Sequence, residues 1–586
     1  MLTASHTRSW PRFARRRLKR LGVRGVRFRR GPFLRLVRHF LTRLVRGGND
    51  ASAMEFELGI GGLLGLLAAP GAFTCLLLLD KYSTLVNWIQ GRPRPDLYLT
   101  SLPDKYLFLS LAMAVTGIVT VLKWDKILPD AQDYLNLAPL PVRPRAILLA
   151  NAAAIAIAVL VFAVDVNGVS MTFFPLFVTA AAETALPEFF AFAAVHAACV
   201  LLASLFTFCA VFALLGTFAA VLPPAAFRAI SSWLRGLVIV GFIVLLLSGF
   251  SGPGFLLQLA GDRALRFLPS FWYLGLYQSW QHHATPALAT ATQLALPGLA
   301  AAFLLMAVTY GLSYRRRLAA VLEQGRKATE QQVLGPLLAF LDLFAFRTAG
   351  FPRACYRFVV RALLRNEAHR LAIAVSIGLG WLLALEDISE GQVWEAPLVA
   401  AYLLLLGLRV TFELPAGVPA NWVFRAGLDS RANESAGVAR QIMLSFLTSF
   451  VLLPCLAYSW WRWGAVPAVG HTAYVLAFSW CLIEILLTGY RKVPLTCPVP
   501  GFRDNFLLLC ILLALGFEAF THIGAGLEEA IVAQPLLAML LPAAMLAGWW
   551  WKKRRRKEAL EAGELEPGLI FENLRPRVVE TLNLSD

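Results

Sequence analysis

Few side chains in this sequence have the types and spacing that catalysis needs. Gly249-Phe250-Ser251-Gly252 matches the short GxSG pattern in which an intramembrane serine protease presents its nucleophile. Such a serine needs a histidine from another segment at the same depth, and His196 is the candidate. No Gly-Lys dipeptide and no HExxH occur, so the sequence has neither a GxxxxGK[ST] phosphate-binding loop nor a zincin motif. We therefore expect any ATP hydrolysis to take place on another subunit. The GxSG match competes with a simpler interpretation as a glycine-rich end of a membrane span.

Ionisable residues inside apolar runs are the second source of possible chemistry, because charge is costly in hydrocarbon. A coupled-ion carrier would use two or more deep acids with partners, but most of these residues lie close to a predicted span end. The eight cysteines form no CxxC pair and mostly fall inside apolar runs, so the sequence predicts neither a metal site nor a cofactor site. The ionisable residues considered are His196, Glu386, Glu413, Glu484 and Glu518.

The elements that carry these residues are membrane spans. The chain is 58% hydrophobic with mean hydropathy +0.64. Several apolar runs approach the roughly 18–20 residues that cross a bilayer. We predict an all-α polytopic bundle of about twelve spans, arranged as two six-span pseudo-repeats. The predicted spans are 58–79, 106–122, 146–164, 189–221, 234–250 and 288–312, then 371–385, 396–408, 442–460, 468–487, 506–520 and 531–551.

Lys and Arg are concentrated in alternate loops, and this bias sets the orientation. It places both termini in the cytoplasm and suggests a bacterial inner-membrane protein. The predicted regions are a basic arm (1–53), a first transmembrane half (54–312), a cytoplasmic connector with an interfacial helix (313–370), a second transmembrane half (371–551) and a cytoplasmic tail (552–586).

The net charge of +18 belongs mainly to the N-terminal arm. Residues 1–50 hold fifteen Lys or Arg and a single acid, Asp50. Three interpretations of the arm compete: a grip on anionic lipid headgroups, a nucleic-acid contact that nothing else in the sequence supports, or a start-site artefact, since Met54 stands just before the first span. We expect membrane lipids as partners and no specific nucleic acid.

The most informative stretch is the polar loop 123–145 between the second and third spans. Asp130 and Asp133 are favourable at the start of a helix, and the prolines from Pro139 onward stop that helix and stiffen its exit. The interleaved apolar residues anchor the loop along the membrane face. The loop therefore predicts a short amphipathic helix that offers a docking surface, or else a merely structural interfacial loop. Loop 413–425 of the second half has the same combination of prolines, an aromatic anchor and arginine.

Three features together resemble the membrane subunit of ABC exporters of the type-two (polysaccharide/drug export) permease class. They are the basic amphipathic segment 33–41 before the first span, the sequence LAPLPVRPR at 137–145 entering the third span, and the aromatic outer segment 268–280 before the sixth. In that class the inner loop between spans two and three forms a coupling helix that touches the ATPase subunit. The resemblance implies cytoplasmic ABC ATPase partners, although typical members carry six spans and pair, whereas this chain carries both sets. The implied coupling residues are Asp130, Asp133, Tyr134, Leu137, Leu140 and Arg143, with Pro419, Asn421, Trp422 and Arg425 in the second half.

Two other classes of function stay open. A secondary carrier would transport without ATP and respond to a proton or sodium gradient. A polytopic enzyme would be either the GxSG protease or a lipid-linked glycosyltransferase, which would use paired acids such as Asp96 and Asp104 in the first outer loop. Apolar walls with few deep charges suit a lipid-like or amphipathic substrate in the transport interpretations.

Overall fold

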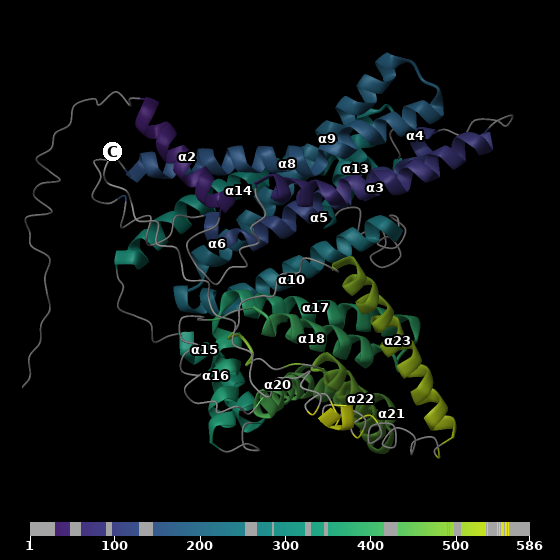
Figure 1. The fold of residues 1–586 in the computed structure, drawn as a ribbon. Coiled ribbons are helices and arrows are strands. Elements are labelled where there is room, and N and C mark those ends of the chain that lie inside the picture. The colour runs from purple at the N-terminus through teal and green to yellow at the C-terminus, as the bar shows by residue number, and fades with distance from the viewer. Residues whose placement is uncertain are drawn as a thin grey trace, which may run out of the picture. The chain divides into compact units, whose positions relative to one another are not determined.

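The structure is a computed structural model of the full chain, and Figure 1 shows its fold. The described residues form helices, turns and irregular segments, and they contain no β-strand. The prediction of an all-α chain is therefore confirmed for these residues. They are 30–46, 60–89, 97–127, 137, 144–251, 267–283, 286–322, 330–344, 350–414, 416, 432–488, 490, 493–496, 506–534 and scattered positions from 536 to 561.

The chain divides into two compact units. One contains Met1–Gly48 and Asp125–Val161, and the other contains Asn49–Trp124 and Phe162–Asp586. The first unit holds the amphipathic helix α2 (Arg30–Arg46) and the first half of α8 (Pro144–Ala182). The second unit holds most of the predicted spans.

The helices of the first half follow the predicted spans in order. Within the second unit, α5 packs against α3, α9 and α10, while α9 packs against α14. The elements are α3 (Ile60–Ile89), α4 (Leu97–Thr100), α5 (Leu102–Leu122), α6 (Trp124–Ile127), α8, α9 (Leu186–Val221), α10 (Pro224–Ser251), α13 (Pro269–Trp280), η1 (Pro286–Leu288) and α14 (Ala289–Leu322).

The connector and the second half are also helical, and α18 packs against α17, α22 and α23. The elements are α15 (Glu330–Asp342), α16 (Phe351–Arg365), α17 (Glu367–Glu390), α18 (Ala396–Phe412), α20 (Ala432–Leu447), η4 (Thr448–Leu452), α21 (Leu453–Trp463), α22 (Ala465–Leu486) and α23 (Phe506–Ala533).

Eight helices among the described residues are long and apolar enough to cross a membrane. They correspond to predicted spans two to six of the first half and to spans one, three and four of the second. A multi-pass membrane protein is therefore supported. Helix α18, at the predicted second span of the second half, has 17 residues.

The predicted outer loop 166–187 is wrong, because most of it is helix. Helix α8 runs to Ala182, and α9 begins at Leu186 after a turn in which Glu183 has φ 54°. The segment after Asp165 contains polar residues, but the hydroxyls of Ser170, Thr172 and Thr179 donate to carbonyls of the same helix, so the helix continues to that turn. The two helices have 39 and 36 residues, or about 58 and 54 Å at 1.5 Å per residue. Both exceed the ~30 Å hydrocarbon core of a bilayer.

The interfacial segment predicted over 358–370 is also split. Helix α16 ends at Arg365, and Asn366 begins α17 by accepting a hydrogen bond from the Ala368 amide at 2.9 Å. An asparagine side chain that caps the first turn satisfies a backbone donor left free at a helix start. The amphipathic helix and the first span of the second half are therefore separate elements with a sharp boundary.

A π-helical turn interrupts the third span of the second half. Pro454 lacks an amide hydrogen, so the Phe450 carbonyl loses its usual helical donor. The indole of Trp381 donates to that carbonyl at 2.8 Å. The five-residue turn η4 precedes this proline, and the indole bond ties it to α17.

Candidate functional site

Nine of the ten predicted coupling residues lie outside the described residues. The tenth, Leu137, is buried, with 9% of its surface exposed. It packs in a small apolar cluster with residues of α2 and the start of α8, and its side chain is therefore not exposed for docking. The nine are Asp130, Asp133, Tyr134, Leu140, Arg143, Pro419, Asn421, Trp422 and Arg425.

The base of the first inner loop is held by α2. Phe40 is fully buried in the cluster, which also contains Leu137, Ile147 and Ala150. The side-chain amide of Asn151 donates to the Ile127 carbonyl at 3.0 Å, which ties α6 to α8 across the loop. Ile127 and Leu137, which flank the first part of the loop, therefore both contact α8.

The base of the second inner loop is held by backbone hydrogen bonds. Leu495 N donates to the Phe412 carbonyl at 3.0 Å, and Ala416 N donates to the Leu495 carbonyl at 2.8 Å. An imidazole nitrogen of His369 lies 3.0 Å from the Leu414 carbonyl. Phe412, Leu414 and Ala416 are therefore tied by hydrogen bonds to α17 and to the residues after α22.

Arginine contacts strengthen the same base. Arg409 pairs with Glu413 at 2.5 Å, donates to the Leu486 carbonyl at 3.0 Å and lies over the Tyr490 ring. Glu484 pairs with Arg440 at 2.5 Å. Glu413 and Glu484 thus have cationic partners at the end of the bundle that the charge bias assigns to the cytoplasm.

The two amphipathic helices occupy similar places. Helix α2 packs on the start of α8, and α16 packs on α20, which begins the third span of the second half. In α16 the apolar face is buried in the protein core, and the Tyr356 hydroxyl donates to the Leu341 carbonyl at 2.9 Å. Burial raises the pKa of Tyr356 to about 12. The expectation that this helix lays its apolar face in the membrane interface is wrong, since α15 and α20 cover that face.

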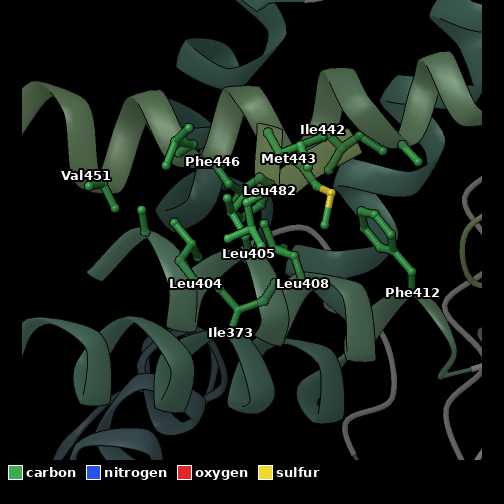
Figure 2. Close-up of a cluster of buried hydrophobic side chains, with 14 of the residues drawn as sticks. Ile373, Leu404, Leu405, Leu408, Phe412, Ile442, Met443, Phe446, Val451 and Leu482 are labelled. Atoms are coloured by element: carbon green, nitrogen blue, oxygen red, sulfur yellow. The ribbon is translucent and has the colours of Figure 1, made fainter. Parts of the chain in front are cut away.

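The helix at the predicted second span, α5 or α18, packs against several other helices of its half. Figure 2 shows side chains of α17, α18, α20 and α22 converging on one cluster in the second half. Leu404, Leu405 and Leu408 of α18 have at most 1% of their surface exposed. Helix α5 has the corresponding position in the first half, between α3, α9 and α10. Movement of an inner loop would therefore reach most of its half through span two.

Helices α10 and α17 join the two predicted halves through small residues. A Cβ added at Gly236 would lie 2.6 Å from Ala374 Cβ, and one added at Gly378 would lie 2.9 Å from Val240 Cγ2. The two contacts are four residues apart on each helix, which is the spacing of small-residue crossings between membrane helices. At the inner end of the same crossing, buried Arg235 pairs with Glu367 at 3.1 Å.

A buried charged cluster lies at the predicted outer end of α5. Asp104 accepts from Lys81 at 2.6 and 2.7 Å and from the Tyr82 hydroxyl at 2.8 Å. Asp104 was considered only as half of an acid pair with Asp96, and the structure gives it a cationic partner. Asp96 lies outside the described residues.

Lys105, the next residue, is fully buried in an aromatic cage. Its ammonium donates to the Tyr98 carbonyl at 2.6 Å and to Gln278 Oε1 at 3.3 Å. It also lies 5.2–5.8 Å from the ring centres of Tyr98, Phe192 and Tyr277. Cation–π contact and hydrogen bonds compensate for its removal from water. Lys105 thereby fastens the outer helix α13 to α5 and α9.

The predicted short outer helix before the sixth span is α13, and it folds back along α14. Trp272 lies against Gly298 of α14, and the Tyr273 hydroxyl bonds the Ala295 carbonyl at 3.4 Å. Tyr273 and Tyr277 are fully buried, whereas Trp280 is 39% exposed. Protein packing, and not headgroup anchoring, therefore holds the two tyrosines.

The proposed protease histidine has another role in this arrangement. His196 is fully buried, and its Nδ1 lies 3.2 Å from the Tyr277 hydroxyl. Rings of Phe108 and Phe174 surround it at centre distances of 5.6 and 5.1 Å. The Ser251 side chain lies outside the described part of the structure. His196 thus acts as a packing residue between α9 and α13.

The second half contains a buried ionisable pair that the sequence analysis missed. His471 Nδ1 lies 2.7 Å from Glu528 Oε1, and the two side chains are 2% and 4% exposed. Trp394 and Trp463 stack on each other at 4.8 Å, and both meet the His471 ring edge-on. The predicted spans ended at residue 520, which left Glu528 in a short outer loop, whereas α23 continues to Ala533. The only available signal was a second ionisable residue in another apolar run.

No metal cluster of three or more His, Cys, Asp or Glu side chains occurs in the part of the chain that the structure describes. In comparisons with known proteins, no family model, no curated protein and no solved structure matches this chain.

Proposed function

We propose that this chain is the membrane-spanning permease of an ABC exporter, with two six-span halves fused in one polypeptide and driven by separate cytoplasmic ATPases. The observation that carries the proposal is the repeated support of the two inner loops. In each half an amphipathic helix, α2 or α16, packs on the start of the third span, where the loop ends. A loop with such a base can take a mechanical load, whereas a flexible linker cannot.

The contacts at the ends of the loops would transmit such a movement to the membrane helices. In the second half, a push on loop 413–425 reaches α18 through Phe412, α17 through His369 and α22 through the Arg409–Leu486 contact. Helix α17 then carries the movement across the small-residue crossing to α10 of the other half. The lack of a phosphate-binding loop in the sequence is why the ATPase must be another subunit. The few charges deep in the described spans suit a lipid-like or amphipathic substrate.

The location of the two loops tests the proposal without knowledge of the substrate. In a background without native cysteines, Asp133→Cys and Asn421→Cys should both react with a membrane-impermeant maleimide only when the reagent reaches the cytoplasmic face. Lys81→Cys, with a 48% exposed side chain at the predicted outer end, is the control for the opposite face. Labelling of either loop from outside would overturn the proposal.

A second candidate function is a proton-linked carrier, and the buried His471–Glu528 pair is the observation that favours it. Transporters relay protons through ionisable residues held inside the membrane. Such a carrier would work without ATP in a proton gradient, whereas the permease would not.

A further inference from the structure

Helix α16 carries four arginines on the face that points away from the protein. Arg353, Arg357, Arg361 and Arg365 follow one another at intervals of four residues, so they lie along one side of the helix. We call these four residues the arginine ladder. The opposite face of α16 is buried, with Tyr356, Val359 and Leu363 all at 0% exposure.

The arginine ladder lines an open trough of about 730 Å³. The other residues that line it are Gly350, Ala354, Phe358 and Ala362, so the lining comes from α16 and its N-cap, and apolar and cationic side chains alternate along it. Phe358 is 40% exposed. The trough therefore fits a ligand that is anionic at one part and apolar at another.

Like charges at this spacing repel one another, so the ladder needs anionic partners. Asp342 of α15 supplies one carboxylate, which lies 3.5 Å from Arg357 and 3.9 Å from Arg361. Those two arginine side chains are still 41% and 52% exposed, so their guanidinium groups can bind a further anion. Guanidinium groups bind phosphate oxygens in a bidentate geometry.

The position of α16 identifies the source of that anion. Only Asn366 separates Arg365, the last residue of the ladder, from α17, which begins the first apolar span predicted for the second half. The ladder therefore lies at the level of the lipid headgroups, on the side that the loop charges assign to the cytoplasm. Anionic lipids in the cytoplasmic leaflet attract such basic segments.

We propose that the arginine ladder of α16 is a binding site for the phosphate headgroup of an anionic phospholipid, with its apolar part against Phe358 and the neighbouring alanines. An acidic protein surface would complement the arginine charges but would not need the apolar side chains that lie between them. The proposal requires only that the chain lies in a membrane, so it is independent of the ATPase coupling proposed above.

The test measures binding of dioctanoyl phosphatidylglycerol to the purified full-length chain by native mass spectrometry, with dioctanoyl phosphatidylcholine as the neutral lipid. Wild type should bind the anionic lipid more tightly. Arg357→Gln/Arg361→Gln should weaken that binding about thirtyfold, since each cation near an anionic membrane surface contributes about 1 kcal/mol. Asp342→Asn should strengthen it about fivefold, because it removes the competing carboxylate.

The control removes an exposed cation at the opposite end of the bundle. Arg462→Gln changes an exposed side chain at the predicted outer end of α21, and it should leave lipid binding unchanged. If Arg357→Gln/Arg361→Gln is not monodisperse, Arg353→Gln/Arg365→Gln replaces it. This variant should also bind phosphatidylglycerol more weakly than wild type.

Three results would overturn the proposal. The first is unchanged phosphatidylglycerol binding in the ladder variants, and the second is equal weakening in the Arg462 control. The third is displacement of the lipid by inorganic phosphate or by an acidic polypeptide at a concentration no higher than that of the lipid, which would indicate a simple anion site or a protein-docking surface.

Discussion

Leucine in place of Gly378 should destabilise the chain by about 1–3 kcal/mol, because α10 and α17 can no longer approach as closely. Even a single Cβ at this position would lie 2.9 Å from Val240, and leucine adds three more carbon atoms. Packing between membrane helices depends on such close approach, since lipid is as apolar as the side chains it replaces. The thermal midpoint of the purified chain in detergent, followed by size-exclusion fluorescence, would measure the loss.

Gly241→Leu, on the partner helix α10, is the matched control. A Cβ at Gly241 would meet no atom within 4 Å, so this change should leave the midpoint nearly unaltered. The double variant Gly236→Leu/Gly378→Leu should have a lower thermal midpoint than Gly378→Leu alone, because both contacts of the crossing are lost. Equal midpoints for Gly378→Leu and Gly241→Leu would show that α10 and α17 do not cross as described.

Leucine in place of His471 should cost about 3–5 kcal/mol, which is the penalty expected when one member of a buried ion pair loses its partner. The Glu528 carboxylate would remain 4% exposed without the imidazole 2.7 Å away. A lower thermal midpoint that recovers partly at acidic pH would identify an unpaired carboxylate as the cause, since protonation removes its charge.

The double variant His471→Leu/Glu528→Leu should be less damaging than His471→Leu alone, because two apolar residues leave no buried charge. Glu529→Gln changes the exposed neighbouring acid and should have almost no effect. If the double variant is worse than the sum of the single changes, the pair has a role beyond electrostatic balance. Loss of gradient-driven transport in Glu528→Gln would then favour the proton-linked carrier.

The sequence allowed most of the helices to be predicted, because long apolar runs can satisfy their backbone groups in a membrane only as helices. It failed where a boundary depended on a single residue. The predicted outer loop 166–187 contains polar residues, but Ser170 and Thr179 donate to carbonyls of α8 itself, and the real break is the turn at Glu183. The segment 358–370 had the amphipathic period of one helix, but the cap at Asn366 divides it.

The charge and prolines of the inner loops allowed a docking site to be predicted from the sequence. The long-range contacts that hold the surrounding helices together could not be predicted. Lys105 and Gln278 are 173 residues apart in sequence, and His471 and Glu528 are 57 apart. No periodicity within one segment indicates such partners, which meet only when the helices pack. Leu137 shows the same difficulty, since the resemblance implied a docking contact and the structure buries its side chain against α2 and α8.

Cross-linking to the ATPase is the most direct test of the central claim. A photoreactive residue at Asp133 or Asn421, in cells that co-express a tagged candidate ABC ATPase, should give a covalent adduct with that ATPase from either position. Asp130→Lys/Asp133→Lys should abolish the adduct formed from Asn136 in the same loop while the chain remains monodisperse. Adducts that are unchanged by this reversal of charge, or transport at full rate by the purified chain with no ATPase present, would contradict the account.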